Sequence, residues 1–486
     1  MSEHGPPARS LLRATGAYVA ALTLARGVSL VAVPLVTWAV STEELGEFAV
    51  LNSVVLLSFA IMVDLGLDTA GVRLASEESG KGRRSVFSTL LGFRMLLAGA
   101  VAGLLVLFRQ PVAELALGAD EHADLIPWLA FTLVLGSPAR AVSNWLRVEG
   151  RHMPVALAMG VVGALEGGLF IVLVYGLRWG LEGLVVGRVA AQAIALLPLL
   201  WIGREVLLTR PSRRWIAPLF RIGVPFAALY ALTGLREFDR FLVAELGSLS
   251  AAGVYDLAVR VAAPLGMLNL ALMMTLEPAL HARRADENLG RDVDTFLQAY
   301  IWLGGSVSFV VAVFGPELAG LVSESYRAAV LVVPAMLFLE VLEGARRIAG
   351  VGGELAQRTG LWIATGAVNA SLTIGLSLWL IPRFPLLGAP TALVVGAAAG
   401  TLVANRLAEG VRRLELRVAR GVLVCVIGAT AATYLVSLDR HGAASLVARV
   451  AAALIAPLLG AALLGVTWSK LRATVAAVRA RAGGAP

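Results

Sequence analysis

The sequence contains little charge and almost no cysteine. Asp, Glu, Lys and Arg together make up 15% of the 486 residues, against about 25% in an ordinary soluble domain. The single cysteine, Cys425, excludes a disulfide framework and a cysteine-based metal site. The five histidines lie in predicted loops or tails without the spacing of metal ligands. We therefore expect no structural metal and no cofactor.

Motifs of common catalytic sites are also missing. The sequence has no GxxxxGK[ST] phosphate loop, no HExxH and no GxSxG. The longest loop predicted on the outside, about 109–124, carries acids that could serve a membrane glycosyltransferase, but nothing larger is available there to bind an acceptor. We therefore expect a protein that is not an enzyme.

Apolar residues dominate what is present. They make up 58% of the chain, and the mean hydropathy is +0.80. A membrane-spanning helix needs roughly 20 mostly apolar residues, and an open sheet cannot satisfy its backbone in lipid. The sequence predicts an all-α integral membrane protein with fourteen transmembrane helices, at about 17–40, 47–71, 86–108, 125–147, 154–177, 180–202, 217–246, 254–280, 296–321, 328–349, 359–381, 387–407, 419–438 and 443–468.

The distribution of basic residues predicts the orientation. With the N-terminus inside, 27 Lys and Arg residues fall in inside loops and tails, and five fall in outside loops. Cytoplasmic loops of membrane proteins retain positive charge, so both termini are predicted to be cytoplasmic. The same rule accounts for the net charge of +8, and we expect no nucleic-acid partner.

The sequence matches itself at an offset of 207 residues. Gly16 falls on Gly223, Gly46 on Gly253, and Arg140 on Arg347. The offset carries span 1 onto span 7, so each repeat has six helices, and an even number keeps both repeats in the same orientation. Such parallel repeats occur in transporters and are related by an axis along the membrane normal. We expect two parallel six-helix lobes around a central cleft, although a static scaffold with an old duplication would share this pattern.

This reading divides the chain into six parts. They are a cytoplasmic N-terminus (1–16), an N-lobe of helices 1–6 (17–203), a cytoplasmic linker (204–216), a C-lobe of helices 7–12 (217–407), the additional helices 13 and 14 (419–468), and a cytoplasmic C-terminal tail (469–486).

Several predicted spans contain arginine. Ionisable groups at membrane depth are costly and usually face an interior or a wet cavity, and the arginine fork grips phosphate with two hydrogen bonds. In the first lobe, four arginines face two acids, Asp64 and Glu166, which predicts a cationic surplus. The alternative for each residue is structural pairing or snorkelling toward the interface. The candidates for binding an anionic, diphosphate-bearing substrate are Arg26, Arg94, Arg140, Arg188, Arg240 and Arg260.

Acids within the spans have another possible use. A carboxylate withdrawn from water takes up a proton more readily, so it can couple transport to an ion gradient of H⁺ or Na⁺. Glu340 and Glu343 lie one turn apart in the tenth span, and Asp64 and Glu166 are their counterparts in the first lobe. These four residues are candidates for ion coupling, with a paired or wet structural carboxylate as the alternative.

Four short motifs resemble the polysaccharide and oligosaccharide flippase family, which belongs to the multidrug, oligosaccharidyl-lipid and polysaccharide exporter superfamily. Gly46 and Phe48 match its turn before helix 2, and Asp64-Leu65-Gly66 matches a motif late in helix 2. In the second lobe, Asp239-Arg240 and Gly253 with Tyr255 match the corresponding elements. The resemblance covers most of helices 1–12.

The resemblance implies two lobes arranged in a V around a cleft. It also implies that a polyprenyl-diphosphate-linked oligosaccharide is flipped across a bacterial inner membrane, driven by an ion gradient, beside glycan polymerases or glycosyltransferases. Arg26 resembles the helix-1 arginine that flippases of lipid-linked peptidoglycan precursors use for the diphosphate, so that substrate is an alternative. Others are a cation-coupled drug exporter, a major-facilitator carrier, and a non-transporting scaffold of a glycan-assembly complex.

Overall fold

The structure is a computed structural model that describes residues 27–28, 31–234, 238–282, 289–351, 359–409, 416–438 and 443–467. Its contacts divide the chain into two compact units. One comprises Ala20–Asp256, and the other includes the chain from Leu257 onward. Both units consist of helices, and no strand occurs in the described ranges.

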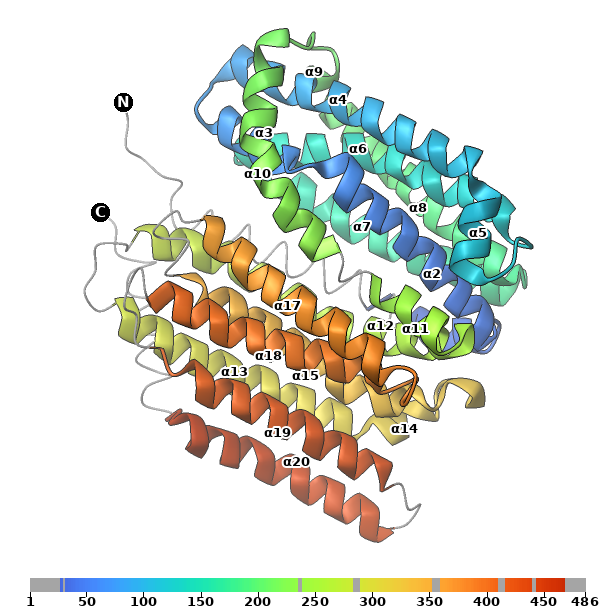
Figure 1. Cartoon of the computed structure of the whole chain (residues 1–486), viewed down its shortest axis with the longest axis vertical. Coiled ribbons are helices and arrows are strands. Elements are labelled where there is room, and N and C mark those ends of the chain that lie inside the picture. The colour runs from blue at the N-terminus through green and yellow to red at the C-terminus, as the bar shows by residue number, and fades with distance from the viewer. Residues whose placement is uncertain are drawn as a thin grey trace. The chain divides into compact units, whose positions relative to one another are not determined.

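The unit Ala20–Asp256 packs its long helices side by side (Figure 1). Residues 31–37 are helical. The elements that follow are α2 (Thr42–Ser58), a π-helical segment η1 (Phe59–Asp64), α3 (Leu67–Ser76), α4 (Gly80–Leu107), α5 (Arg109–Leu117), η2 (Ala123–Leu125), α6 (Ile126–Val148), α7 (His152–Phe170), η3 (Ile171–Gly176), α8 (Gly180–Ile202), α9 (Arg204–Leu207), η4 (Arg213–Trp215), α10 (Ile216–Gly234), α11 (Asp239–Leu246) and the start of α12 (Leu249–Ala282).

The second unit contains the rest of α12 and the helices that follow it. In Figure 1, α13, α15, α19 and α20 run alongside one another. The elements are α13 (Leu289–Val313), α14 (Gly315–Ala319), η6 (Glu324–Tyr326), α15 (Ala329–Ala349), α17 (Thr359–Leu380), α18 (Gly388–Glu409), α19 (Val418–Ser437) and α20 (Ala443–Leu464).

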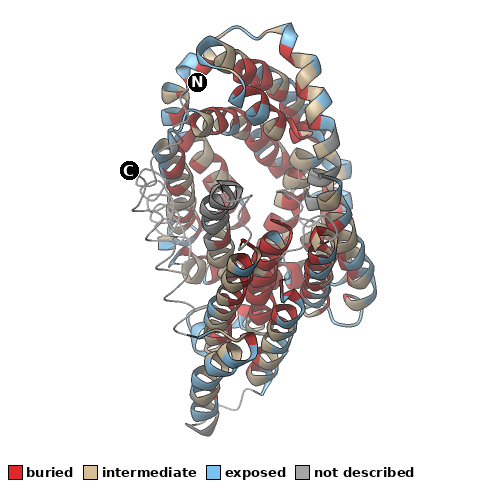
Figure 2. Cartoon of the chain, turned by 90° about the vertical axis from the view of Figure 1, so that its left-hand side faces the viewer, coloured by how far each residue is buried: buried red, intermediate tan, exposed pale blue. Residues whose placement is uncertain are grey.

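The surface of both units is apolar where a water-soluble protein would be polar. Leu107, Trp201 and Leu458 each expose about 70% of their surface, at 73%, 71% and 71%. Figure 2 shows that the buried residues lie on the faces where helices pack against one another, while exposed residues line the other faces. Large apolar side chains on the outside of long helices are typical of a surface covered by lipid. The chain is a multi-pass membrane protein.

The predicted all-helical membrane fold is confirmed, whereas the number of fourteen spans is not and stays a prediction. Ten helices of the described ranges are long and apolar enough to cross a bilayer. They are Thr42–Asp64, Gly80–Leu107, Ala123–Val148, Met153–Gly176, Gly180–Ile202, Leu289–Val313, Gly360–Leu380, Gly388–Glu409, Val418–Ser437 and Ser445–Leu464. A helix such as α15 also occupies a predicted span, but it carries four charged residues near its end.

The lobe boundaries expected from the repeat stay a prediction. Contacts group α10, α11 and the start of α12 with the helices of the expected N-lobe, because the first compact unit extends to Asp256. Helix α12 itself runs without interruption from Leu249 to Ala282, and therefore belongs to both units.

The second predicted span, 47–71, is not one continuous helix. It begins earlier, at Thr42, where Ser41 forms a capping box: its hydroxyl accepts from the Glu44 backbone, and the Glu44 carboxylate accepts from the Ser41 backbone. It then widens into the π-helical segment Phe59–Asp64 and breaks at Leu65 and Gly66. Both have positive φ angles, 43° and 71°.

Packing explains why the break contains glycine. A Cβ atom at Gly66 would overlap the carbonyl oxygen of Gly223 on α10 and lie 2.8 Å from Cβ of Phe226. The close approach of α10 and the left-handed backbone both exclude a side chain at this position. The helix therefore restarts at Leu67 with its first turn pressed against α10.

We expect Gly66→Ala to lower the free energy of unfolding by roughly 1–3 kcal/mol, because the new methyl group meets backbone at a left-handed position. Gly99→Ala is the matched control, since a Cβ there meets nothing within 4 Å. Unfolding of the purified proteins in detergent measures the difference. Equal stability of the two variants would contradict the packing argument.

Candidate functional site

A cluster of charged residues lies at the break in the second span. Asp64 is the last residue of the π-helical segment, and Asp68 lies in the first turn of α3. The two residues are four apart across the break, and both carboxylates meet the same guanidinium of Arg94. Both acids thus lie on one side of the span, where an arginine from the neighbouring helix α4 can reach them.

Arg94 is fully buried between these acids. Its side chain has no exposed surface. Nη2 donates to Asp64 Oδ1 at 2.9 Å and to Asp68 Oδ2 at 3.1 Å, while Nη1 forms a short ion pair with Asp68. A buried charge persists only when it is paired and hydrogen-bonded. Arg94 is therefore engaged within the protein rather than open to a substrate.

Arg140 of α6 lies at the edge of this cluster and differs from Arg94 in its exposure. Its Nη1 is 4.0 Å from Asp68 Oδ2, and 55% of its side chain is exposed. Its guanidinium lies over the ring of Phe59 at 4.4 Å from the centroid. The ring and Asp68 hold the guanidinium in place, but most of its hydrogen-bond donors remain open to an anionic ligand.

The open side of Arg140 is not the lipid-facing side of α6. Trp128 and Phe131 expose 54% and 46% of their surface on that helix. Arg140 follows Phe131 by nine residues, which is about two and a half helical turns and places it on the opposite face. Arg140 also lies eight residues, or roughly 12 Å, from the helix end at Val148.

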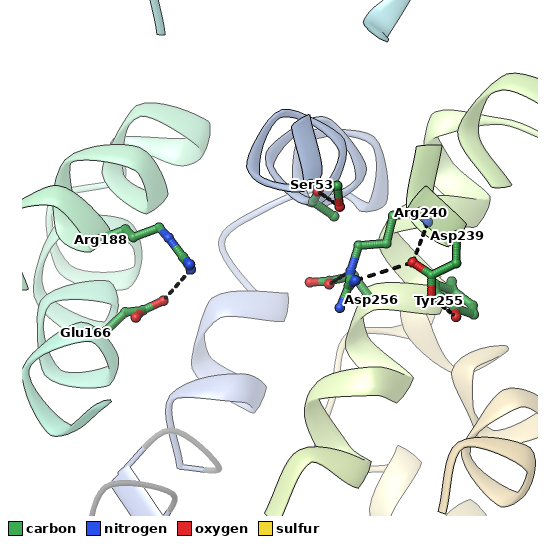
Figure 3. Close-up of polar contacts among 8 residues, drawn as sticks. Ser53, Glu166, Arg188, Asp239, Arg240, Tyr255 and Asp256 are labelled. Atoms are coloured by element: carbon green, nitrogen blue, oxygen red, sulfur yellow. Dashed lines mark hydrogen bonds and ion pairs between the residues drawn. The ribbon is translucent and has the colours of Figure 1, made fainter. Parts of the chain in front are cut away.

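Glu166 and Arg188 form a second pair in the same unit, between α7 and α8. Arg188 Nη1 donates to Glu166 Oε1 at 3.1 Å, and both side chains are about one-fifth exposed. Figure 3 shows the two side chains reaching toward each other. The buried Nε of Arg188 has no partner in the described part of the chain.

The family-like residues of the second lobe form a third group, which Figure 3 also shows. Arg240 Nε donates to Asp256 Oδ1 at 2.9 Å, and Nη1 lies 3.3 Å from Asp239 Oδ1. The hydroxyl of Tyr255 donates to the other oxygen of Asp239. These contacts tie α11 to the first turns of α12. Arg260, one turn further along α12, is half-buried and belongs to the other unit.

The acids of the tenth span lie in different surroundings. Glu343 is buried and accepts from Arg346 at 2.7 Å and from Asn369 at 3.3 Å. Glu340 is half-buried, and its backbone carbonyl accepts from Asn269 at 2.6 Å. In the described ranges no group of three or more His, Cys, Asp or Glu residues could hold a metal ion.

The sequence analysis missed Asp68, and its count of two acids facing four arginines in the first lobe is wrong. Asp68 lies in the same span as Asp64, and it also pairs with Arg94. The four-residue spacing between Asp64 and Asp68 was the available signal. The role predicted for Arg26 is not tested, because this residue lies outside the described ranges.

Comparisons with known proteins identify the family and the fold. Residues 11–283 match a family described as "Polysaccharide biosynthesis protein". The chain belongs to this family. A probable multidrug resistance protein NorM from Chromobacterium violaceum is 24% identical over 426 residues, which cover 79% of this chain and 90% of that protein.

Solved structures show the same fold. The lipid II flippase MurJ in an inward closed conformation matches with a TM-score of 0.70 and 12% identity, over 92% of this chain and 98% of that chain. An inward-facing multidrug transporter of the MATE family gives 0.61 and 16%, over 88% and 99%. A transporter from Pyrococcus furiosus gives 0.62 and 14%, over 84% and 98%. The chain therefore has the fold of the multidrug, oligosaccharidyl-lipid and polysaccharide exporter superfamily.

The buried charge cluster leads to a stability prediction. Arg94→Ala leaves Asp64 and Asp68 without their buried partner, and we expect it to lower the free energy of unfolding by about 3–5 kcal/mol. Arg84→Ala on the same helix breaks a more exposed pair with Glu205, which we expect to cost at most about 1 kcal/mol. Detergent unfolding curves of both variants provide the measurement. A loss for Arg94→Ala no larger than that for Arg84→Ala would contradict the assignment.

Proposed function

We propose that the chain is a flippase that carries a polyprenyl-diphosphate-linked oligosaccharide across a bacterial inner membrane by alternating access. The fold and the family match support a membrane transporter for polysaccharide synthesis. The observation that carries the substrate class is Arg140, an open guanidinium within a membrane-spanning helix, on the face opposite Phe131. Arginine matches the geometry of a diphosphate.

The way that the acids are paired favours an anionic over a cationic substrate. Asp64 and Asp68 bond to Arg94, Glu166 to Arg188, and Glu343 to Arg346. A drug exporter that binds cations would need carboxylates available to the drug, whereas here each of these four acids already faces an arginine. A peptidoglycan-precursor lipid shares the polyprenyl diphosphate and remains the second candidate substrate.

The proposal includes an orientation and partners. Both termini lie in the cytoplasm, the lipid tail stays in the bilayer, and a gradient of H⁺ or Na⁺ drives the cycle. The candidates for ion coupling are Asp64, Glu166, Glu340 and Glu343. Asp64, Glu166 and Glu343 would take up the ion by exchanging it for their arginine partner during the cycle. The protein itself performs no bond chemistry. Glycosyltransferases would supply the lipid-linked glycan, and a polymerase would consume it on the outer face.

Arg140→Gln tests the anion contact. We expect the rate of flipping of a fluorescent polyprenyl diphosphate in liposomes to fall about 10–100-fold, because a hydrogen bond to a charged group contributes about 1.5–3 kcal/mol. Arg84→Gln, which changes a half-buried arginine of the same unit that pairs with Glu205, should flip at the normal rate. If both variants kept the normal rate, Arg140 would not contact the substrate. A wild-type protein that flips no faster than protein-free liposomes would favour a non-transporting scaffold.

Arg26 is tested in cells, since its role rests on the sequence. We expect Arg26→Ala and Arg26→Glu to abolish glycan export in a strain that lacks the native protein, because both remove the guanidinium expected to hold the diphosphate. Surface glycan is the measurement, and immunoblotting of membranes controls for expression. Normal export with both variants would exclude this role.

A further inference from the structure

A stripe of exposed side chains follows helix α8 to its end and continues past it. The stripe consists of Ile194, Leu197, Trp201, Arg204 and Leu208, at spacings of three and four residues, which is the spacing of one helix face. The four apolar members expose 46%, 64%, 71% and 83% of their surface, and Leu208 has the highest value among the large apolar residues that the structure describes. The stripe is apolar along α8 and reaches its one charged residue, Arg204, just after α8 ends at Ile202.

The length of α8 indicates that Arg204 lies at the level of the lipid head groups. Helix α8 has 23 residues, which is roughly 34 Å and close to the ~30 Å thickness of the hydrocarbon core. Trp201, in the last turn, therefore falls in the interfacial layer that tryptophan favours, and Arg204 follows one turn later. The Arg204 guanidinium lies over the Trp201 ring, 5.6 Å from its centroid. An aromatic ring and a cation thus lie together where acyl chains meet head groups.

Packing fixes the direction in which these side chains point. Gly203, between α8 and α9, lies against α6, because a Cβ atom there would lie 2.5 Å from a methyl carbon of Val142. Val206 in α9 is fully buried, whereas Arg204 and Leu208 on either side of it are exposed. Helix α9 therefore has one face packed in the protein and one face that presents Arg204 and Leu208 to the outside.

Two hydroxyl groups of α4 hold the loop that follows α9. The Ser88 hydroxyl donates to the backbone carbonyl of Thr209, and the backbone N–H of Ser212 donates to Thr89 Oγ1 at 2.9 Å. Figure 1 shows α9 beside α4, with which it is in contact. The backbone between α8 and α10 is therefore tied to the helices, and its exposed side chains project from a preformed surface.

This surface has a surplus of positive charge. Residues 201–215 contain four arginines and one acid, Glu205. Glu205 lies 2.8 Å from Arg84 of α4, and Arg214 lies 3.7 Å from Glu78. The other three arginines are exposed and form no ion pair within the described ranges; they are Arg204, Arg210 and Arg213. We call Trp201, Arg204, Leu208, Arg210 and Arg213 the α8–α10 surface.

We propose that the α8–α10 surface binds an anionic phospholipid of the surrounding bilayer, which is not itself transported. An acyl chain lies along Leu197 and Trp201, and the phosphate accepts hydrogen bonds from the open guanidinium of Arg204. Arg210 and Arg213 add positive potential, which attracts anionic head groups. In the proposed orientation this lipid belongs to the inner leaflet. The competing explanation is an ordinary solvated basic loop, which has no preference for one lipid over another.

Native mass spectrometry of the full chain, titrated with phosphatidylglycerol or phosphatidylcholine, tests the preference for an anionic lipid. We expect the wild type to bind phosphatidylglycerol at least about 10-fold more tightly, because each basic residue at a membrane surface contributes about 5-fold. The triple variant Arg204→Gln, Arg210→Gln and Arg213→Gln should lose this preference. Equal affinity of the wild type for both lipids would overturn the proposal.

A second triple variant removes the same amount of charge from the same end of this unit. Arg73, Lys81 and Arg151 are also exposed, and they lie near the end of α3, the start of α4 and the end of α6. Arg73→Gln, Lys81→Gln and Arg151→Gln together should leave the preference for phosphatidylglycerol unchanged. An equal loss in both triple variants would show that only the net charge attracts the lipid, which would overturn the assignment to the α8–α10 surface.

Brominated lipids test where the phospholipid binds, because bromine quenches the fluorescence of a tryptophan that it contacts. We expect brominated phosphatidylglycerol to quench the wild type more strongly than brominated phosphatidylcholine, and Trp201→Phe to remove this difference. Trp128→Phe is the control, since it removes another exposed tryptophan, at the opposite end of α6 from Val148, and it should preserve the difference. A difference that survives in Trp201→Phe would place the bound lipid elsewhere and overturn the proposal.

The binding measurements do not depend on transport. A protein that fails to flip the fluorescent polyprenyl diphosphate but binds phosphatidylglycerol through the α8–α10 surface would contradict the proposed function alone. A protein that flips normally without any preference for phosphatidylglycerol would contradict the lipid surface alone.

Discussion

The ion pair of Arg94 with Asp64 and Asp68 is the interaction on which the first compact unit depends. The second span breaks between these two acids, with a left-handed backbone at Leu65 and Gly66, and both acids reach one guanidinium. Gly66 in turn sets how closely α10 approaches. The ion pair thus lies at the break of one span and beside the close packing of another. It also leaves Arg140 as the open cation beside a cluster that is otherwise paired.

Burial separates the intramembrane arginines into two kinds. Arg94 and Arg240 lie against carboxylates and hold helices together, Arg94 without any exposed side-chain surface. Arg140 is held by an aromatic face and by a carboxylate at the limit of ion pairing, and more than half of its side chain is exposed. The difference is energetic: an arginine that already satisfies two acids has little to gain from a phosphate, whereas an open guanidinium gains charge-assisted hydrogen bonds.

Much of the fold could be predicted from the sequence, because the length of apolar runs and the repeat are both visible in one dimension. Helices appear where apolar runs predicted them, and the repeat pairs Gly46 with Gly253 in space as well as in sequence. The break at Leu65 could not be predicted, since a π-helical turn and a left-handed leucine leave no trace in hydropathy. Arg94 was a reasonable ligand candidate by charge alone; only the side-chain geometry shows that two acids occupy it. The position of Arg26 is not described, so its role stays a prediction.

Gly46 and Gly253 lie against each other, and a Cβ atom on either one would overlap the first carbonyl oxygen of the opposite helix, at Leu249 or Thr42. This reciprocal contact has a consequence for how the chain could have arisen. If a single six-helix ancestor had paired with its own copy about a two-fold axis, one glycine would have served both sides of the interface, because each copy would have presented it to the start of the other's helix. Duplication and fusion then turn one genetic position into two. Each half inherits the same steric requirement at Gly46 and Gly253, although the residues around them are free to diverge. Gly46 and Gly253 would then preserve the contact of two identical subunits within a single polypeptide.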